Sequence, residues 1–473
     1  MEKMKIYSGD NVEVMLSGEQ AGHKLAARDI KCGEQIIKYG YPIGVATTDI
    51  KAGEWVHTHN LKSGLHGILE YSYTPNFSEL ESLPARTFMG YPRPTGRPGI
   101  RNEIWIVPTV GCVNASARAV EKRFAKEIEG IDGVHAYTHP YGCSQLGDDA
   151  EHTLDAIVGL IRHPNAGGVL VMGLGCENTQ MDKVKARLGE WDDNRVKFMI
   201  CQDETDEVET ACKLVEELVE YASKIKRQEF PVSELVVGLK CGGSDGFSGL
   251  TANPLVGHFA DKLVAMGGSV ILTEVPEMFG AETILMSRCR TEELFDKTVS
   301  MINRCKENFI AHGCEVYENP SPGNKAGGIS TLEEKSLGCT FKGGTSPVAG
   351  VLSYGEQVSV KGLNLLEGPG NDLVSATSEV VSGAQITLFT TGRGTPFGAP
   401  APVVKIATNS RLAEKKKCWI DFNAGRLLEG NDMETVCGEL FDYIVSVASG
   451  ETKTKTEING ARDFCIYRSG VTL

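Results

Sequence analysis

The spacing of hydrophobic positions changes twice along the chain, and each change predicts a different kind of structure. In residues 1–72, short Val- and Ile-rich pieces alternate with glycine-containing turns, and no helical period is sustained. Such a pattern is typical of short strands joined by tight turns. It predicts a small all-β module at the start of the chain.

Residues 73–99 show neither a helical nor a strand period, and they are rich in proline. The prolines at positions 75, 84, 92, 94 and 98 fall within this short stretch. Proline fixes one backbone angle and removes a hydrogen-bond donor, which favours extended chain. We therefore expect a linker between the β module and the remainder of the protein.

From residue 100 onward, apolar strand-like runs alternate with amphipathic helical segments. The predicted strands are 104–110, 134–138, 169–173, 235–239 and 270–275. Asn114 and Asn253 are each expected to cap a helix, and Pro254 would then occupy the first helical position of the second one. Alternating strands and helices predict an α/β fold with a parallel sheet covered on both faces. We expect one α/β domain over 100–320 and a second α/β region over 321–473 that completes the catalytic part.

Composition and charge narrow the possible partners. The 473 residues are 41% hydrophobic and carry a formal net charge of −14, which argues against nucleic acid and anionic membranes as partners. No apolar run approaches the ~18 residues of a membrane span, and the first residues lack a secretory signal, so a cytoplasmic location is expected. The 14 cysteines are then expected to be thiols or metal ligands rather than disulfides.

Four of these cysteines follow four predicted strands, each within a glycine-containing turn. They are Cys112, Cys143, Cys176 and Cys241. Ligands of open parallel sheets bind beyond the carboxyl ends of the strands, where thiolates are suited to iron or another soft metal. We predict Cys112, Cys143 and Cys176 as metal ligands. The alternative is that these thiols are small core residues.

A second candidate metal site lies at the end of the β module. In a strand, His57 and His59 would point to the same face and could chelate one ion, leaving Asn60 for a substrate oxygen. His59 is also a candidate catalytic group. The alternative is an exposed polar strand face without a ligand.

The glycine-rich stretch from Cys241 to Asn253 joins a strand to a helix. Its backbone N–H groups and the following helix start suit a carboxylate or phosphate. We expect Ser244 to act in catalysis and Asp245 and Asn253 to bind substrate. Residues 242–246 also match G-x-S-x-G, the motif of serine hydrolases. In those enzymes the helix begins directly after the nucleophilic serine, whereas the helix predicted here starts about eight residues later, which argues against a hydrolase.

Glu274 follows another predicted strand and is our candidate for the general base. Several polar residues in glycine-rich or strand-flanking positions are suited to an anionic substrate. We predict as substrate ligands Arg97, Arg101, Asn102, Lys240 and Lys342.

Together, six segments resemble the altronate/galactarate dehydratase family of sugar-acid hydro-lyases. They are residues 53–60, 90–102, 173–177, 241–254, 274–282 and 335–339. The resemblance covers nearly the whole chain. It implies a β-clip (SAF) module, a linker and a Rossmann-like catalytic region. It also implies a homodimer.

The resemblance further implies metal-dependent β-elimination of water from a sugar acid such as altronate or galactarate, giving a 2-keto-3-deoxy acid. The expected metal is Fe²⁺ or Mn²⁺, and the alternative cofactor is an iron–sulfur cluster on the strand-edge cysteines. The related sulfolactate sulfo-lyases carry the two parts on separate chains, so the fused chain favours sugar acids but leaves sulfolactate open.

Two other classes of function are weighed against a lyase. A nicotinamide dehydrogenase needs G-x-G-x-x-G after a strand, and the segment from Gly173 to Gly175 lacks the third glycine. A non-catalytic protein that binds sugar acids stays open, because it would share the binding groups. Formation of a keto acid distinguishes it from an enzyme.

Overall fold

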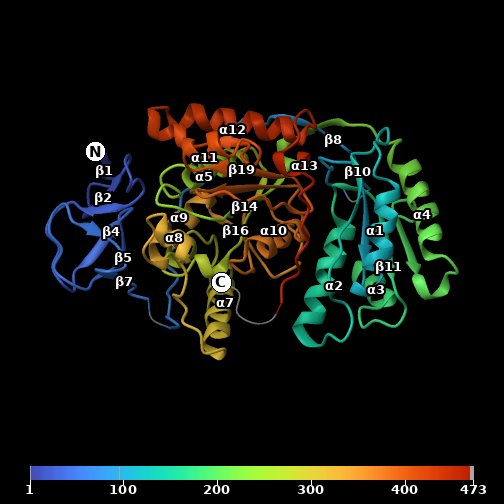
Figure 1. The fold of residues 1–473 in the computed structure, drawn as a ribbon, viewed down its shortest axis with the longest axis horizontal. Helices are drawn as coiled ribbons and strands as arrows, with labels where there is room; N and C mark the ends of the chain where they lie inside the picture. Colours follow the sequence, from blue (N-terminus) through green and yellow to red (C-terminus); the bar gives the residue numbers. More distant parts are fainter. Residues whose placement is uncertain (1, 66, 95, 469–473) are drawn as a thin grey trace.

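The computed structural model describes residues 2–65, 67–94 and 96–468. Three bodies follow one another along the long axis of the molecule (Figure 1). The N-terminal β module lies at one end, a four-stranded α/β unit lies at the other, and a seven-stranded α/β unit lies between them.

The N-terminal module contains two small antiparallel sheets, ordered β1-β2-β3-β6 and β4-β5-β7. Inward-facing apolar side chains such as Val12, Ile36, Ile43 and Val56 form its core, so the predicted all-β module is confirmed. Its strands are β1 (Lys3–Met4), β2 (Val12–Met15), β3 (Lys24–Ala26), β4 (Gln35–Lys38), β5 (Tyr41–Ala46), β6 (Trp55–Val56) and β7 (Leu61–Lys62).

The segment after the module is extended. Between β7 and β8 (Thr87–Gly90), the described residues form neither helix nor strand. β8 then pairs antiparallel with β13 (Gln228–Pro231). The chain passes through β8 before it enters the four-stranded unit and through β13 after it leaves that unit. Part of the expected linker is therefore a strand.

The four-stranded unit has a parallel sheet ordered β10-β9-β11-β12. Every residue of β9 and β11 is buried, which explains the apolar run that follows Glu103 in β9 and the apolar sequence of β11. The strands are β9 (Glu103–Pro108), β10 (Gly133–Ala136), β11 (Ala166–Gly173) and β12 (Val196–Ile200), the last of which the sequence did not predict. The helices are α1 (Asn114–Arg123), α2 (Gly147–Arg162), α3 (Met181–Leu188) and α4 (Glu207–Ala222).

The central unit has a parallel sheet ordered β16-β17-β15-β14-β18-β19-β20. Its strands are β14 (Val236–Cys241), β15 (Ser269–Leu272), β16 (Val348–Leu352), β17 (Gly362–Leu366), β18 (Ile386–Thr391), β19 (Val403–Ala407) and β20 (Phe422–Asn423). Its helices are α5 (Ala252–Ala265), α6 (Glu282–Met286), α7 (Glu292–Ala311), α8 (Pro322–Ala326), α9 (Leu332–Thr340), α10 (Asp372–Val381), α11 (Ser410–Lys415), α12 (Met433–Ala448) and α13 (Lys455–Ile458).

This sheet places the domain boundary differently from the sequence prediction. β14 and β15 precede residue 320, yet β14 pairs with β18 and β15 pairs with β17 from the later part of the chain. The division expected at 320/321 therefore falls inside one sheet. The two α/β units meet instead between α4 and β13.

Two helix starts also differ from the prediction. Asn114 is the first residue of α1 rather than its cap, and its amide donates to the carbonyl of His139. Asn253 lies inside the first turn of α5, because Thr251 occupies the cap position. In the part of the chain that the structure describes, no helix is long and apolar enough to cross a membrane.

Candidate active site

Glu274 lies just beyond β15 and is almost fully buried. Its φ of 70° is left-handed, which is uncommon for a residue other than glycine. The carboxylate accepts hydrogen bonds from the ammonium groups of Lys240 and Lys342 and, at 3.2 Å, from the backbone N–H of Cys241. Burial raises the pKa of Glu274, while the two lysines oppose that rise. Three residues that the sequence singled out separately thus form one buried group.

The lysines are held as cations by the carboxylates around them. Burial acts to lower the pKa of Lys240, but Glu274 and Asp372 overcome this and hold that pKa above its ordinary value. The Asp372 carboxylate lies 3.0 Å from the Lys240 ammonium and is about one-third exposed. The pKa of Lys342 is likewise raised against the effect of burial, by Cys241 and Glu274.

A second buried carboxylate, Glu277, lies beside the first. Its two oxygens lie 2.8 Å from the ammonium of Lys335 and 2.8 Å from the thiol of Cys339. Burial alone would raise the pKa of Glu277, but Lys335 and the other nearby lysines lower it to about 2. Sequence reasoning gave Glu277 and Lys335 no site role, although both lie in segments that carry the family resemblance.

The thiols of Cys241 and Cys339 complete the centre. Their sulfurs lie 3.2 Å apart, and Cys241 Sγ lies 3.6 Å from a Glu277 oxygen. The hydrogen bond from Cys339 lowers the pKa of Cys241, and the same contact raises the pKa of Cys339. Within the described residues, no other trio of His, Cys, Asp or Glu brings its donor atoms within 4.8 Å of one another. Two thiols and a carboxylate suit a thiophilic divalent ion.

A small cavity adjoins this centre. Its free volume is about 10 Å³, roughly the room that one water needs. The backbone carbonyl of Ser244 accepts from Asn324 at 2.8 Å, but the buried Ser244 hydroxyl has no hydrogen-bond partner. The lining residues include Tyr39, Ser244, Asn253, Glu334, Lys335 and Cys339. The free hydroxyl is a ready donor or acceptor for a ligand.

Asp245 and Asn253 also line the cavity, but their polar atoms are already occupied. Asp245 accepts from Thr408 at 3.0 Å and from Asn409 at 3.1 Å, and burial raises the Asp245 pKa. The Asn253 amide donates to Gly338 O at 2.8 Å and accepts from Thr390. In this structure both side chains hold the glycine-rich loop in place.

The N-terminal module is joined to the centre through α9. Lys24 and Lys38 of the module lie 2.7 and 2.8 Å from the two oxygens of Glu334, and all three side chains are buried. Burial alone would raise the pKa of Glu334, but these lysines lower it to about 2. Glu334 precedes Lys335 directly, so this module borders the same cavity as the charged centre.

His57 and His59 lie in a turn that follows β6, so the prediction that they share one strand face was wrong. The Nε2 atom of His57 lies 2.9 Å from Lys325 O, whereas His59 is exposed, with its ring 5.3 Å from that of Trp55. The Asn60 amide holds this turn, accepting from His57 N and donating to Trp55 O at 2.9 Å each.

Cys112, Cys143 and Cys176 lie at the carboxyl edge of the four-stranded sheet, and all three are exposed. Cys241 belongs to the other sheet, so the expectation of four thiols at one edge was wrong. The central unit separates these three cysteines from the module that carries His57 and His59 (Figure 1). The five predicted metal ligands therefore cannot share one ion.

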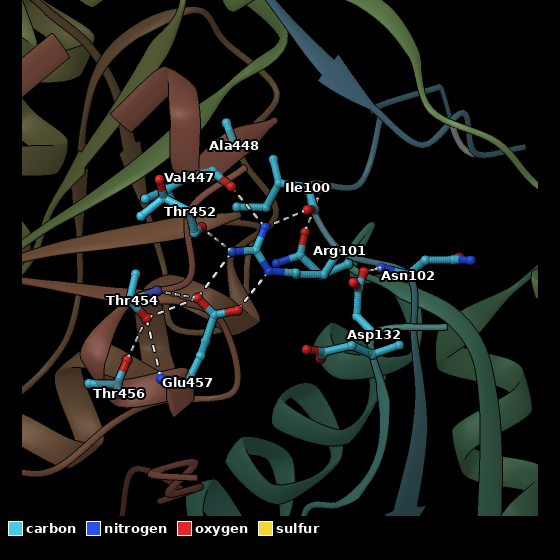
Figure 2. A network of polar contacts seen from close by, with 12 residues as sticks. Ile100, Arg101, Asn102, Asp132, Val447, Ala448, Thr452, Thr454, Thr456 and Glu457 are labelled. Carbon is cyan, nitrogen blue, oxygen red and sulfur yellow. Dashed lines mark hydrogen bonds and ion pairs between the residues drawn. The ribbon is translucent and has the colours of Figure 1, made fainter. Parts of the chain in front are cut away.

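Arg101 and Asn102 lie at the amino end of β9, where Arg101 ties the two α/β units together and Asn102 bonds within the four-stranded unit. Figure 2 shows the Arg101 guanidinium against the Glu457 carboxylate, with Nε–Oε1 at 2.6 Å. Arg101 also donates to Val447 O at 2.8 Å, and the Asn102 amide donates to Gly130 O at 2.8 Å. Arg97 lies half-buried near Gly383, also away from the charged centre. These three predicted substrate ligands do not gather at the cavity.

Comparisons with known proteins match this three-part organisation. The family models that match are the altronate/galactarate dehydratase SAF domain over residues 3–64, the D-galactarate dehydratase/altronate hydrolase second domain over 90–223, and the D-galactarate/altronate dehydratase C-terminal domain over 232–472. The boundary between the last two falls where the structure separates the α/β units. The fold and these matches define a lyase with a SAF module and two α/β units.

The chain belongs to the altronate/galactarate dehydratase family. It is 54% identical to the altronate dehydratase of Bacillus subtilis (strain 168), over 100% of this chain and 95% of the relative. It is 52% identical to the altronate dehydratase of Escherichia coli (strain K12), over 98% of this chain and 95% of the relative. It is 35% identical to the L-threo-forming galactarate dehydratase of Escherichia coli (strain K12), over 92% of this chain and 86% of the relative.

Proposed function

We propose that this protein is a hydro-lyase that removes water from altronate to give a 2-keto-3-deoxy acid. The identity to altronate dehydratases is 52–54%, against 35% to a galactarate dehydratase, which supports altronate over galactarate. The structural observation that carries the proposal is the unpartnered Ser244 hydroxyl in a cavity bordered by Lys335 and Cys339.

The chemistry of elimination matches the charges of the centre. A proton next to a carboxylate is a very weak acid, so the site must stabilise the charge that develops on the carboxylate as the proton leaves. Lys240, Lys335 and Lys342 provide fixed positive charge in a dry environment, where electrostatic interactions are stronger than in water. We assign Lys335, which lines the cavity, to the substrate carboxylate and Ser244 to a substrate hydroxyl.

Glu274 is our candidate for the general base. Burial raises its pKa, which makes Glu274 a stronger base than an exposed carboxylate, and Lys240 and Lys342 hold its carboxylate in one orientation. Glu274 does not itself line the small cavity. Proton transfer to Glu274 therefore requires the cavity to widen toward β15 when substrate binds.

We propose that Cys241, Glu277 and Cys339 hold the metal of this family, with Fe²⁺ or Mn²⁺ as the expected ion. Their donor atoms lie within 4.8 Å of one another, and soft thiolates favour such ions over Mg²⁺. Bound there, the ion would supply positive charge for the substrate oxygens. This assignment replaces the predicted pair His57 and His59, because neither belongs to the group.

Substrate binding must open the site. A cavity that admits about one water cannot hold a six-carbon acid. A groove of about 560 Å³ runs between the N-terminal module and residues 317–332, and Ser330 lies in its wall. We propose that substrate enters along this groove as the module and the segment from Tyr317 to Thr331 move apart.

A substrate panel tests the function. Purified protein, supplied with Fe²⁺ and reductant, is incubated with altronate, galactarate and sulfolactate, and keto acid and sulfite are measured. We expect the highest kcat/KM with altronate. Sulfite from sulfolactate without keto acid from the other two would indicate a sulfo-lyase, and binding without turnover would indicate a sugar-acid binding protein. The homodimer and the cytoplasmic location stay predictions.

A further inference from the structure

Three exposed thiols gather at one edge of the four-stranded sheet, and the proposed reaction uses none of them. The neighbouring strands β10, β9 and β11 end next to one another, and the loops after them carry Cys143, Cys112 and Cys176. Each of these cysteines is exposed. The four-stranded unit that carries this edge lies at the opposite end of the molecule from the N-terminal module (Figure 1).

Hydrogen bonds join the three loops into one network. The N–H of Gly111 donates to Tyr141 O at 2.8 Å, and the N–H groups of Asn178 and Thr179 both donate to Gly142 O at 3.0 Å. Each of the three cysteines therefore lies within a few residues of a backbone hydrogen bond that joins its loop to a neighbouring loop. The backbone holds the thiols as a group rather than leaving each on a separate flexible turn.

Two further features fix the same loops. Gly142 has a φ of 99°, and a Cβ at this position would lie 2.0 Å from Thr109 O, so the Cys143 loop can approach β9 only with glycine there. The buried carboxylate of Glu177 accepts from the Thr109 hydroxyl and from Gly175 N, both at 2.6 Å. This carboxylate ties the Cys176 loop to the same point on β9.

The separation of the three sulfurs excludes one ion bound by all of them. A single thiolate-bound ion keeps its ligands within about 4.6 Å of one another, twice a metal–sulfur bond of about 2.3 Å. The three sulfurs do not all lie within 4.8 Å of one another. A larger inorganic group, with iron atoms at its corners, accommodates thiolates that are farther apart.

We propose that Cys112, Cys143 and Cys176 ligate an iron–sulfur cluster at the carboxyl edge of the four-stranded sheet, separate from the buried Cys241–Cys339 centre. On binding, each thiol loses its proton to solvent and forms one iron–sulfur bond, and one iron keeps no protein thiolate. The cluster is a second metal site and does not rest on the proposed dehydration.

The fourth strand explains why three thiolates are assigned rather than four. β12 ends directly before Cys201, which is only partly exposed. Cys112, Cys143 and Cys176 are exposed, so these three thiols are the ones that we assign to the cluster.

Anaerobic reconstitution of the full chain with iron, sulfide and a thiol reductant tests the proposal. After desalting, iron and acid-labile sulfide are counted per chain, and the visible absorbance of the cluster and its EPR signal after reduction are recorded. The variants are Cys112→Ser, Cys143→Ser and Cys176→Ser. The controls are Cys418→Ser, an exposed thiol elsewhere, and Cys241→Ser in the buried centre.

We expect each edge variant to lose most of the sulfide and the visible absorbance, while both controls keep them at the level of the parent chain. Circular dichroism of the edge variants should match the parent, because the replaced side chains are exposed. Equal iron and sulfide in the parent and the three edge variants would overturn the proposal. So would the absence of acid-labile sulfide in the reconstituted parent chain.

Discussion

Lys335 and Cys339 lie one helical turn apart on α9 and engage the two oxygens of one carboxylate, that of Glu277. Residues four apart share a helix face, so this arrangement follows from the helix itself. Glu334, the residue before Lys335, points instead to Lys24 and Lys38 of the N-terminal module. One short helix thus connects the module to the charged centre.

The Ser244 hydroxyl should contribute to turnover and not to folding. We expect Ser244→Ala to lower kcat with altronate by about 10- to 1,000-fold, the range for losing a positioned hydrogen bond at a reacting centre. Ser382→Ala is the matched control, because its hydroxyl is also buried without a partner but lies outside the cavity. Labelling of Ser244 by a fluorophosphonate probe would instead support a serine hydrolase.

Metal removal should abolish activity. After dialysis against a chelator, we expect Fe²⁺ or Mn²⁺ to restore keto-acid formation better than Mg²⁺, because thiolates bind the softer ions more tightly. Cys339→Ser should narrow the difference between the activities that Mn²⁺ and Mg²⁺ restore, since an oxygen donor replaces a sulfur. Equal rescue of the parent chain by Mg²⁺ would point to an all-oxygen site and against Cys241 and Cys339 as ligands.

The contact between module and α9 should weaken in acid. The folded-state pKa of Glu334 is about 2, below an unfolded value of about 4.3. Its contribution to stability is therefore complete above the unfolded pKa and is lost as the pH falls from about 5 toward 2. Urea unfolding of the parent and of Glu334→Gln across this range should show a smaller loss of stability with acid in the variant. Identical pH dependence would contradict the buried pairing with Lys24 and Lys38.

Arg101 should matter for stability rather than for substrate. Removing one partner of a buried ion pair typically costs about 3–5 kcal/mol, so Arg101→Met should lower the free energy of unfolding by about that amount. At a temperature where the variant stays folded, its KM for altronate should equal that of the parent. A large rise in KM without loss of stability would restore Arg101 as a substrate ligand and would contradict its pairing with Glu457 (Figure 2).

Much of the fold could be predicted because local patterns determine it. The apolar runs at 104–108 in β9 and throughout β11 reflect strands that are buried on both faces. β12 was missed because Lys197 interrupts its apolar run and only two of its five residues, Val196 and Met199, are buried. The boundary expected at residue 320 failed because pairing of β14 with β18 joins distant segments.

The site was predictable only in part. Glu274, Lys240 and Lys342 were found because strand ends and glycine-rich turns mark the ligand edge of a parallel sheet. His57 and His59 were paired on the assumption that β6 continues, but the strand ends at Val56. The contact between Lys24 and Glu334 joins residues 310 positions apart, so no local sequence pattern predicts it.

The most direct test of the central claim compares two buried, ion-paired carboxylates. Glu277 lies in the proposed site with Lys335, whereas Glu282 pairs with Lys306 outside it. We predict that Glu277→Gln lowers kcat/KM for dehydration of altronate by about 100-fold or more, with unchanged circular dichroism, because it removes a metal ligand and the partner of Lys335. Glu282→Gln should keep kcat/KM within a few-fold of the parent. Near-parental turnover by Glu277→Gln would contradict catalysis at this centre.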